Sequence, residues 1–363
     1  MFDYLISVKP LGFLYGSAGA FLSAKNLVGK SGAKFPPDAS VLSGLILRTY
    51  QENSLDGAEN IKKELTVAGA FWAKDDDLES FYVPIPRSHI FGEHVVDQKS
   101  KQKKDDYNQW ALTSTGWTPC KDENNKEKEV SSDYKWQKID FWDSRSLSNT
   151  LKNGLAKETP WRFNPFLHPQ LQENQRHVLE KDGLFLENAV QMSEDTCLVY
   201  LATHTIPDGW YRFGGESHLV EIRSEKIDHQ SKIYKLLNTK ISKSFALICP
   251  AVWGTNNLSK RYPDAFKHNG KCPQMLTDRP VPFRYRLGKN ERKNSSVLGV
   301  GRYAVPAGTV YVLKHELNKT WWEFPNEWFP QNDRTKLPDG QHTLLKQLGC
   351  GLCLPITVKG LEE

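Results

Sequence analysis

The stretch that most constrains the fold runs from Trp210 to Ile222 and places two consecutive glycines between two strand-forming segments. Gly214 and Gly215 have no Cβ, so the backbone can turn there through angles that other residues avoid, or a ligand can approach the main chain closely. From His218 to Ile222 polar and apolar residues alternate, which is the period of a half-buried strand. The pattern predicts a strand, a glycine corner and a second strand, read either as an ordinary hairpin turn or as a ligand contact.

Other segments complete an α+β pattern. Residues 2–8 predict an opening strand, and Pro36-Pro37-Asp38 predicts the entry and cap of a helix that continues to Tyr50. Residues 197–202 form a continuous apolar run, typical of a strand covered on both faces. A helix within 227–241 and a buried strand at 245–250 follow. We therefore expect an α+β fold.

Length and composition suggest two domains and an arm. A chain of 363 residues predicts roughly two domains, which we place at 1–200 and 201–363. From residue 97 the composition changes, because 97–106 and 121–129 are poor in apolar residues and rich in both charge signs. These stretches predict solvated loops or a protruding arm over about 97–140. Aromatic residues in the arm suit either a small hydrophobic base or a stacking surface.

Further segments carry weaker signals. Residues 81–86 read as an extended edge strand because of their prolines, and residues 160–165 read as irregular. Residues 298–313 predict two strands joined at 306–308, and residues 255–270 predict a basic loop. The aromatic cluster at 321–328 marks either a protein interface or part of the core.

Charge and cysteine usage restrict the class of protein. A net charge of +5, a pI near 8.7 and many aromatic residues suit RNA or a large partner. Six scattered cysteines predict free thiols in a reducing compartment, and Cys350 and Cys353 read as a buried pair at a strand end. The N-terminal segment has neither a basic start nor a long uncharged span, so we expect a cytoplasmic protein without cofactor or metal.

Common catalytic motifs are absent from the sequence. The sequence has no phosphate-binding loop, nucleophile elbow, zinc-protease motif or dinucleotide fingerprint. A metal-free ribonuclease needs only histidines as general acid and base, and the chain offers His89, His177, His204 and His218. Each of these also fits an ordinary surface or core histidine.

Several separated stretches, taken in order, resemble one protein family. They are residues 10–21, 35–48, 67–71 with 82–86, 213–218 and 305–311. Together they resemble the third subunit of the type III-B CRISPR effector, the Cmr complex, a family of the RAMP superfamily in its Cas-five group. The resemblance implies two ferredoxin-like, RRM-type domains with a long charged insertion in the first.

The resemblance also implies a role in antiviral defence. Such a subunit binds the 5′ tag of the guide RNA and joins the large polymerase-cyclase subunit to the guide-coating RAMP subunits of the ribonucleoprotein, without being a nuclease. Two rival interpretations stay open: a metal-independent RAMP endoribonuclease that processes precursor guide RNA, and a purely structural adaptor that makes no RNA contact.

A single-stranded tag is held by main-chain amides, by cations and by stacked rings. We expect one continuous surface that contains Arg48, Arg87, His89, Arg212, Gly214, Gly215 and His218, with Glu216 in a structural role. The remaining residues predicted to bind RNA lie in the N-terminal loop, before the first helix and in the last third of the chain: Tyr15, Gly16, Ser17, Lys34, Arg302, Gly349 and Gly351.

Overall fold

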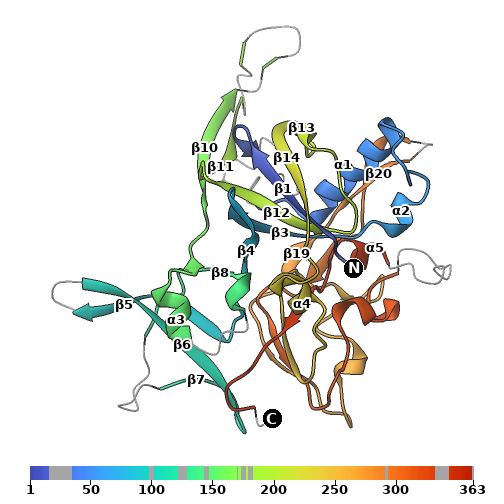
Figure 1. The fold of residues 1–363 in the computed structure, drawn as a ribbon. Coiled ribbons are helices and arrows are strands. Elements are labelled where there is room, and N and C mark those ends of the chain that lie inside the picture. The colour runs from blue at the N-terminus through green and yellow to red at the C-terminus, as the bar shows by residue number, and fades with distance from the viewer. Residues whose placement is uncertain are drawn as a thin grey trace.

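The computed structural model describes residues 1–15, 35–97, 102–121, 129–142, 147–169, 171–172, 177–178, 183–290, 293–331 and 343–361. Over these residues most of the regular structure is strand and the helices are few (Figure 1). The predicted α+β class is confirmed at this level. None of the helices described is long and apolar enough to cross a membrane.

The largest element is a sheet of eight strands in the order β13-β14-β1-β12-β3-β4-β8-β9. The predicted opening strand is β1, which pairs antiparallel with β14 on one side and with β12 on the other. The strands are β1 (Tyr4–Pro10), β3 (Val67–Lys74), β4 (Asp77–Pro84), β8 (Trp136–Lys138), β9 (Ala156–Lys157), β12 (Thr196–Ala202), β13 (Gly209–Phe213) and β14 (His218–Lys226).

The sheet differs from the sequence-based expectation at β4 and at its β13 end. The segment 81–86 is not at an edge, because β4 lies between β3 and β8, and its prolines fall at and after the last residue of the strand. The sheet also continues past the predicted domain boundary at residue 200, since β13 and β14 join it through β1.

Each face of the sheet is covered by a different layer. Helix α1 (Ala39–Glu52) lies on one face, where Leu42 and Ile46 pack with Val8 of β1. The alternate residues of the same strands face the C-terminal part of the chain, so Leu5 shares a core with Trp321. Every residue of β12 is buried, which confirms the prediction of a strand covered on both faces.

The C-terminal part has its own sheet, with strand order β18-β23-β15-β24. The predicted pair of strands within 298–313 exists as β22 and β23, but they do not pair with each other. Instead β22 pairs with β19, whereas β23 lies between β18 and β15. The strands are β15 (Ser244–Leu247), β18 (Gln274–Leu276), β19 (Val281–Phe283), β22 (Arg302–Ala304), β23 (Val310–Val312) and β24 (Cys353–Pro355).

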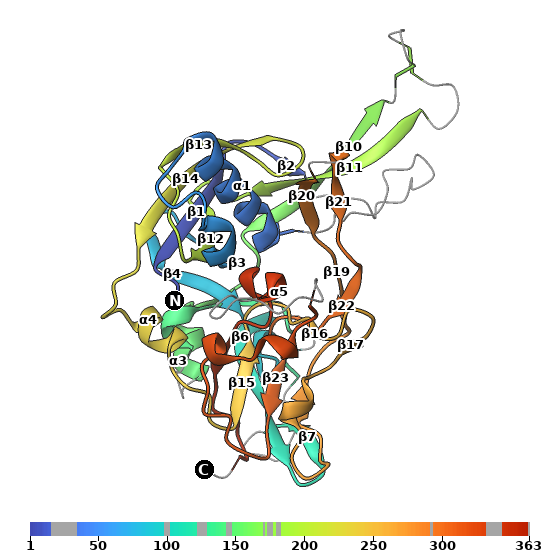
Figure 2. The ribbon, with the colours of Figure 1, turned by 90° about the vertical axis from the view of Figure 1, so that its right-hand side faces the viewer.

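Two three-stranded ribbons extend from the main sheet. In the first, β11 (Leu184–Met192) pairs with β10 (Trp161–Pro169) and with β2 (Leu14–Tyr15), and Figure 2 shows β10 and β11 projecting from the body. The prediction that 160–165 is irregular is therefore wrong. In the second, β6 (Gln102–Thr113) lies between β5 (His89–Asp97) and β7 (Gly116–Pro119). The charge-rich residues 102–106 are thus strand rather than loop, and most of 121–129 lies outside the described residues.

The remaining elements are short. The helices are α2 (Ile61–Glu64), α3 (Leu147–Lys152), α4 (Lys232–Leu237) and α5 (Leu344–Gln347). Two further two-stranded ribbons are formed by β16 (Trp253–Gly254) with β17 (Ser259–Lys260), and by β20 (Arg286–Asn290) with β21 (Lys293–Leu298). Single turns of 3-10 helix occupy Ile139–Phe141, Asp264–Phe266, Trp321–Glu323 and Asn326–Trp328.

The aromatic cluster at 321–328 belongs to the core. Trp321, Phe324 and Trp328 are buried, and the ring of Trp321 stacks on Phe2 with centroids 5.8 Å apart. The core alternative for this segment is thereby confirmed. All six cysteines are free thiols, and Cys350 and Cys353 are buried as predicted.

Candidate nucleic-acid interface

The glycine corner is the turn between β13 and β14. Phe213 pairs with His218 across the ladder, so the turn consists of the four exposed residues 214–217. Gly214 has φ +75° and Ser217 has φ +56°, and the Ser217 N–H donates to the Gly214 carbonyl at 3.3 Å. A glycine is needed at 214 because of this backbone angle, since an added Cβ would meet only Val41 Cγ1 at an ordinary 3.9 Å.

That contact places the corner beside the first turn of α1. Asp38 occupies the predicted cap position in an extended conformation, but its side chain makes no capping hydrogen bond. The approach to the helix is fixed instead by Tyr200 of β12, whose hydroxyl donates to the Pro37 carbonyl at 2.8 Å. The amino end of a helix favours anions because its first amides point outward unpaired. The exposed turn 214–217 can offer backbone groups to a phosphate, whereas the amino end of α1 is turned to the interior, where Ala39 is buried.

The predicted cations near the corner differ in their surroundings. Arg212 is exposed on β13, and it has no carboxylate partner among the residues that the structure describes. Arg48 is also exposed, but its Nε donates to Glu52 Oε1 at 2.7 Å, one helical turn further on. His218 begins β14 and is half-buried. A solvent-exposed pair such as Arg48 with Glu52 is weak, so Arg48 can exchange its partner for a phosphate.

Arg87 and His89 lie elsewhere. They follow β4, which is five strand spacings from β13 in the main sheet, or about 24 Å. Arg87 Nη2 lies 3.1 Å from Asp278 Oδ2, and the Arg87 amide donates to the Gly308 carbonyl at 2.7 Å. The predicted residues thus do not form one continuous patch, because Arg48 lies on α1, Arg212 projects from the face of the sheet opposite α1, and the third group follows β4.

His89 is a poor cation in its position. Its Nδ1 is enclosed and has no hydrogen-bond partner within the described chain. Burial lowers the pKa of His89 to about 4 because the charged imidazolium loses its hydration. The ring is therefore neutral at neutral pH.

Three other predicted residues lie in the interior. Arg302 is 8% exposed, and its guanidinium donates to the carbonyls of Thr255 and Asn256 at 2.9 and 3.2 Å. Gly349 and Gly351 have positive φ and allow tight packing, since an added Cβ would lie 2.5 Å from Ala68 Cβ and 2.6 Å from Trp253 Cη2 respectively. These residues organise the fold around them and do not face the glycine corner.

The N-terminal loop is only partly described. Tyr15 ends β2, where its backbone pairs with Ala189 of β11. The other predicted residues of this region, Gly16, Ser17 and Lys34, lie outside the described residues.

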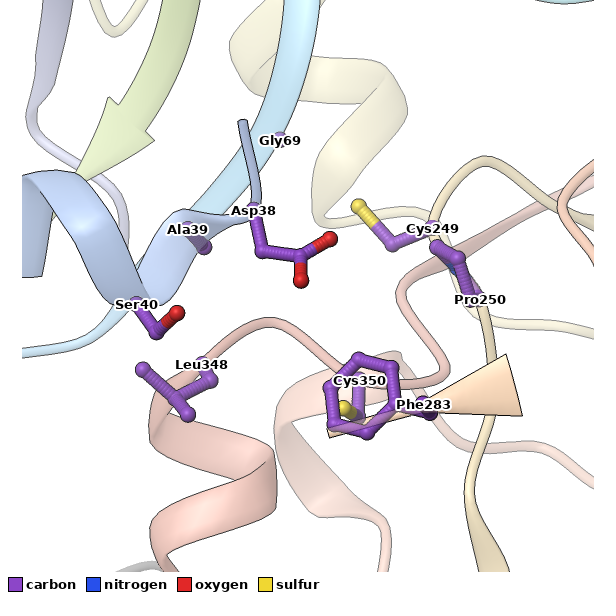
Figure 3. A pocket seen from close by; sticks show the side chains of 9 residues that line it. All are labelled: Asp38, Ala39, Ser40, Gly69, Cys249, Pro250, Phe283, Leu348 and Cys350. Atoms are coloured by element: carbon purple, nitrogen blue, oxygen red, sulfur yellow. The ribbon is translucent and has the colours of Figure 1, made fainter. Parts of the chain in front are cut away.

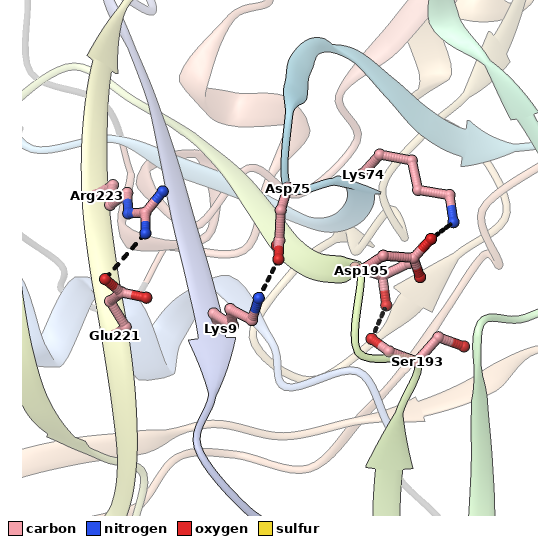
Figure 4. A network of polar contacts seen from close by, with 8 residues as sticks. Lys9, Lys74, Asp75, Ser193, Asp195, Glu221 and Arg223 are labelled. Carbon is pink, nitrogen blue, oxygen red and sulfur yellow. Dashed lines mark hydrogen bonds and ion pairs between the residues drawn. The ribbon is translucent and has the colours of Figure 1, made fainter.

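One exposed face of the main sheet was missed from the sequence. Trp210 is 73% exposed, precedes Arg212 by two residues and so projects on the same side of β13. The neighbouring cations on this face are paired: Arg223 Nη2 lies 3.0 Å from Glu221, and Lys9 is paired with Asp75 (Figure 4). The hydrogen bond to Asp75 raises the pKa of Lys9. The sequence does contain a signal for this face. Residues 210–213 alternate, so that Tyr211 and Phe213 point inward while Trp210 and Arg212 point to solvent.

A small cavity lies where α1 begins, but it is too small for a nucleotide. It measures about 20 Å³ and is lined by residues of both halves, among them Asp38, Gly69, Cys249 and Cys350 (Figure 3). A water molecule needs about 10–15 Å³ on this measure, so one water fits. Within the described residues no cluster of His, Cys, Asp or Glu has the arrangement of a metal site. The candidate interface is thus a surface and not a pocket.

Comparison with known structures gives distant similarities. A chain of the "Cryo-EM structure of the Type III-B Cmr-beta bound to cognate target RNA" has 12% sequence identity and a TM-score of 0.46, over 85% of this chain and 86% of that chain. A chain of the "Crystal structure of Csm1-Csm4 cassette in complex with cA4" has 12% identity and a TM-score of 0.34, over 99% and 100%. None of the curated proteins matches this chain.

Comparison with protein families gives the decisive match. The model of the family described as "CRISPR-associated protein (Cas_Cmr3)" matches residues 20–358, which is nearly the whole chain. This is the family to which the ordered stretches of the sequence point. The chain belongs to the Cas_Cmr3 family of CRISPR-associated proteins.

Proposed function

We propose that this protein is a non-catalytic subunit of a type III CRISPR effector, which binds the 5′ tag of the guide RNA at the glycine corner. In this proposal it also bridges the large polymerase-cyclase subunit to the guide-coating subunits. The two layers of the fold, one built on the main sheet and the other on the four-stranded C-terminal sheet, would correspond to two ferredoxin-like domains. Family membership supports the class of complex.

The observation that carries the RNA-binding role is the position of the turn 214–217 over the first turn of α1. The turn is exposed and lies next to Arg212, so backbone amides and a cation without a carboxylate partner in the described chain are available together. Trp210 adds an exposed ring on the same strand. Phosphates bind amides and cations, and unpaired bases stack on rings, so these groups suit the end of a single strand.

The ribbon of β10 and β11 supports the bridging role. On one of its faces Phe163 lies opposite Val190, and Leu167 lies opposite Leu186. Phe163 and Leu167 are 43% and 58% exposed although they are apolar. Contiguous exposed apolar side chains on a projecting element are typical of a surface that a partner protein covers.

The positions of His89, His204 and His218 support a non-catalytic role for these three histidines. A general acid and base must converge on one reacting group. His204 follows β12 near the C-terminal end of β14, whereas His218 begins β14, which corresponds to a separation of about 26 Å along the strand. His89 is on β5, beyond the other side of the main sheet.

The proposal is tested with a labelled RNA that carries the 5′ tag. Arg212→Glu and Arg48→Glu should each weaken binding about tenfold and lower the dependence of affinity on salt by about 0.7 per lost phosphate contact. Lys235→Glu on α4 makes the same change of charge far from the corner and should leave binding intact.

Unchanged affinity in both arginine variants would refute the proposed RNA site. Wild-type binding that is absent at all salt concentrations would favour the structural adaptor. Site-specific cleavage of precursor guide RNA without metal, lost on substitution of a histidine, would favour the endoribonuclease.

A further inference from the structure

We infer that a second surface, at the far end of the C-terminal sheet, binds the backbone of single-stranded RNA without regard to the tag. We name it the basic corner and define it by five residues: Arg261, His268, Lys271, Lys314 and His315. Arg261 and His268 belong to the segment that the sequence marked as a basic loop, and the basic corner goes beyond the proposed tag-binding role.

Strand pairing brings these residues together. β18 and β23 are antiparallel with Gln274 opposite Val312, so the chain just before β18 runs beside the chain just after β23 (Figure 2 labels β23). Lys271 therefore comes next to His315, and Lys314 lies one position away. The rings of His268 and His315 confirm this placement, because they stack with centroids 5.3 Å apart and planes inclined by 30°.

A tight turn presents the loop to solvent. His268 and Lys271 exchange two backbone hydrogen bonds of 3.0 and 2.9 Å, and the two residues between them have positive φ, Asn269 at 48° and Gly270 at 74°. Two consecutive left-handed residues are typical of a two-residue hairpin turn. The turn holds the side chains of His268 and Lys271 on one exposed edge.

The charge of the corner is not balanced by its own acids. Asp264 is the acid of the loop, and it is occupied by Lys260 and by Lys267 at 2.9 Å. Hydrogen bonds from these two lysines lower the pKa of Asp264 to about 2. Arg261, Lys271 and Lys314 are exposed, and within the described residues none has a carboxylate partner. Glu316 is the other acid next to these three cations, so the net charge of the basic corner is positive.

The chemistry of the corner favours a nucleic-acid strand over a protein. The centre of a protein interface is apolar, yet within 260–272 and 314–316, all of them described, no large aliphatic or aromatic hydrophobic side chain is exposed. Exposed cations beside a stacked pair of imidazoles suit phosphates and an unpaired base. A single strand satisfies both kinds of group, whereas an acidic peptide would use only the charges.

The test uses a labelled single-stranded RNA without the 5′ tag, and in parallel an RNA with it. In the double variant Lys271→Glu with Lys314→Glu, affinity for both RNAs should fall about tenfold, and the salt slope should fall by about 1.4, or two phosphate contacts. Lys62→Glu with Lys63→Glu is the matched control, because it reverses two exposed lysines on α2. The control should bind both RNAs like the wild type.

The outcomes separate this site from the tag-binding site. Loss of affinity for both RNAs in the basic-corner variant, while Arg212→Glu weakens only the tagged RNA, supports two sites. Wild-type affinity in the basic-corner variant, or an equal loss in the Lys62 and Lys63 control, overturns the basic corner whatever Arg212→Glu does. Circular dichroism and the unfolding midpoint of each variant verify that the fold is retained.

Discussion

Tyr200 in the centre of the main sheet donates its hydroxyl proton to the carbonyl of Pro37, 2.8 Å away, on the segment that leads into α1. This one bond ties the middle strand of the sheet to the beginning of the helix that supports the glycine corner. Tyr200 is completely buried. Burial raises the pKa of its hydroxyl well above the ordinary value, so the group stays a proton donor at all physiological pH values.

Tyr200→Phe should destabilise the protein by about 1 kcal/mol, because the carbonyl of half-buried Pro37 loses its donor. The free energy of unfolding in urea measures this change. Tyr4→Phe is the control, since Tyr4 is only half-buried on β1 and the donor to the Pro37 carbonyl is Tyr200. An unchanged stability in Tyr200→Phe would show that the bond does not hold the start of α1.

Adjacent glycines in the corner should respond differently to alanine. Gly214 has φ +75°, so Gly214→Ala should cost about 1 kcal/mol of stability through backbone strain. Gly215 has no such angle and no atom within 4 Å of an added Cβ, so Gly215→Ala should be close to neutral. Thermal unfolding of the two variants measures the difference. Equal effects would contradict the conformation of the turn described above.

Lys346 should give the protein a measurable pH dependence. It is 1% exposed, and its Nζ donates to the carbonyls of Trp322 and Phe324 at 2.7 Å each. Burial lowers the pKa of Lys346 to about 7, below the ordinary 10.5. Between these two values the unfolded chain binds a proton that the folded protein does not, so stability rises with pH.

From pH 7 to pH 9 the contribution of Lys346 to the free energy of unfolding should increase by about 2 kcal/mol. Lys346→Met keeps the length of the side chain and removes the titration, so the wild type should gain stability over this range relative to the variant. Urea unfolding at pH 7, 8 and 9 measures both proteins. A constant difference between them would mean that the lysine stays charged, held by its two carbonyls and the ring of Trp321, 5.6 Å away.

The apolar face of the projecting ribbon should matter for assembly and not for folding. Leu167 on β10 and Leu258 near β16 are both 58% exposed. Leu167→Ser and Leu258→Ser should therefore each change the stability of the isolated protein by less than about 0.5 kcal/mol. Only Leu167→Ser should reduce co-purification with the other effector subunits. Equal recovery of partners with both variants would argue against a docking role for the ribbon.

The central strands could be predicted because buried strands have a recognisable pattern of apolar residues in the sequence. The unbroken apolar run of β12 requires cover on both faces, and Gly214 with Gly215 between alternating residues gives the turn of β13 and β14. Strand β10 leaves no such trace. Most of its residues are exposed, and its prolines are tolerated because it is an edge strand.

The arrangement of the site could be predicted only in part. Arg212 could be placed beside the glycines because it precedes Gly214 by only two residues in the sequence. Arg87 follows a strand that lies about 24 Å across the sheet from β13. This distance depends on the order of the strands, and a local sequence pattern does not reveal strand order. Arg302 looks like any surface cation in the sequence, but its position on β22 turns it toward the carbonyls of Thr255 and Asn256.

The interior that Leu5 and Trp321 share has a mechanical consequence. Because both halves of the chain pack on one sheet and are not joined by a linker alone, they cannot swing about a hinge without breaking that interior. The glycine corner is part of this sheet, and the projecting ribbon joins the segment that follows β1 through β2. If the proposed RNA-binding and docking roles hold, the distance between the RNA end and the docked subunit would therefore be fixed by the fold.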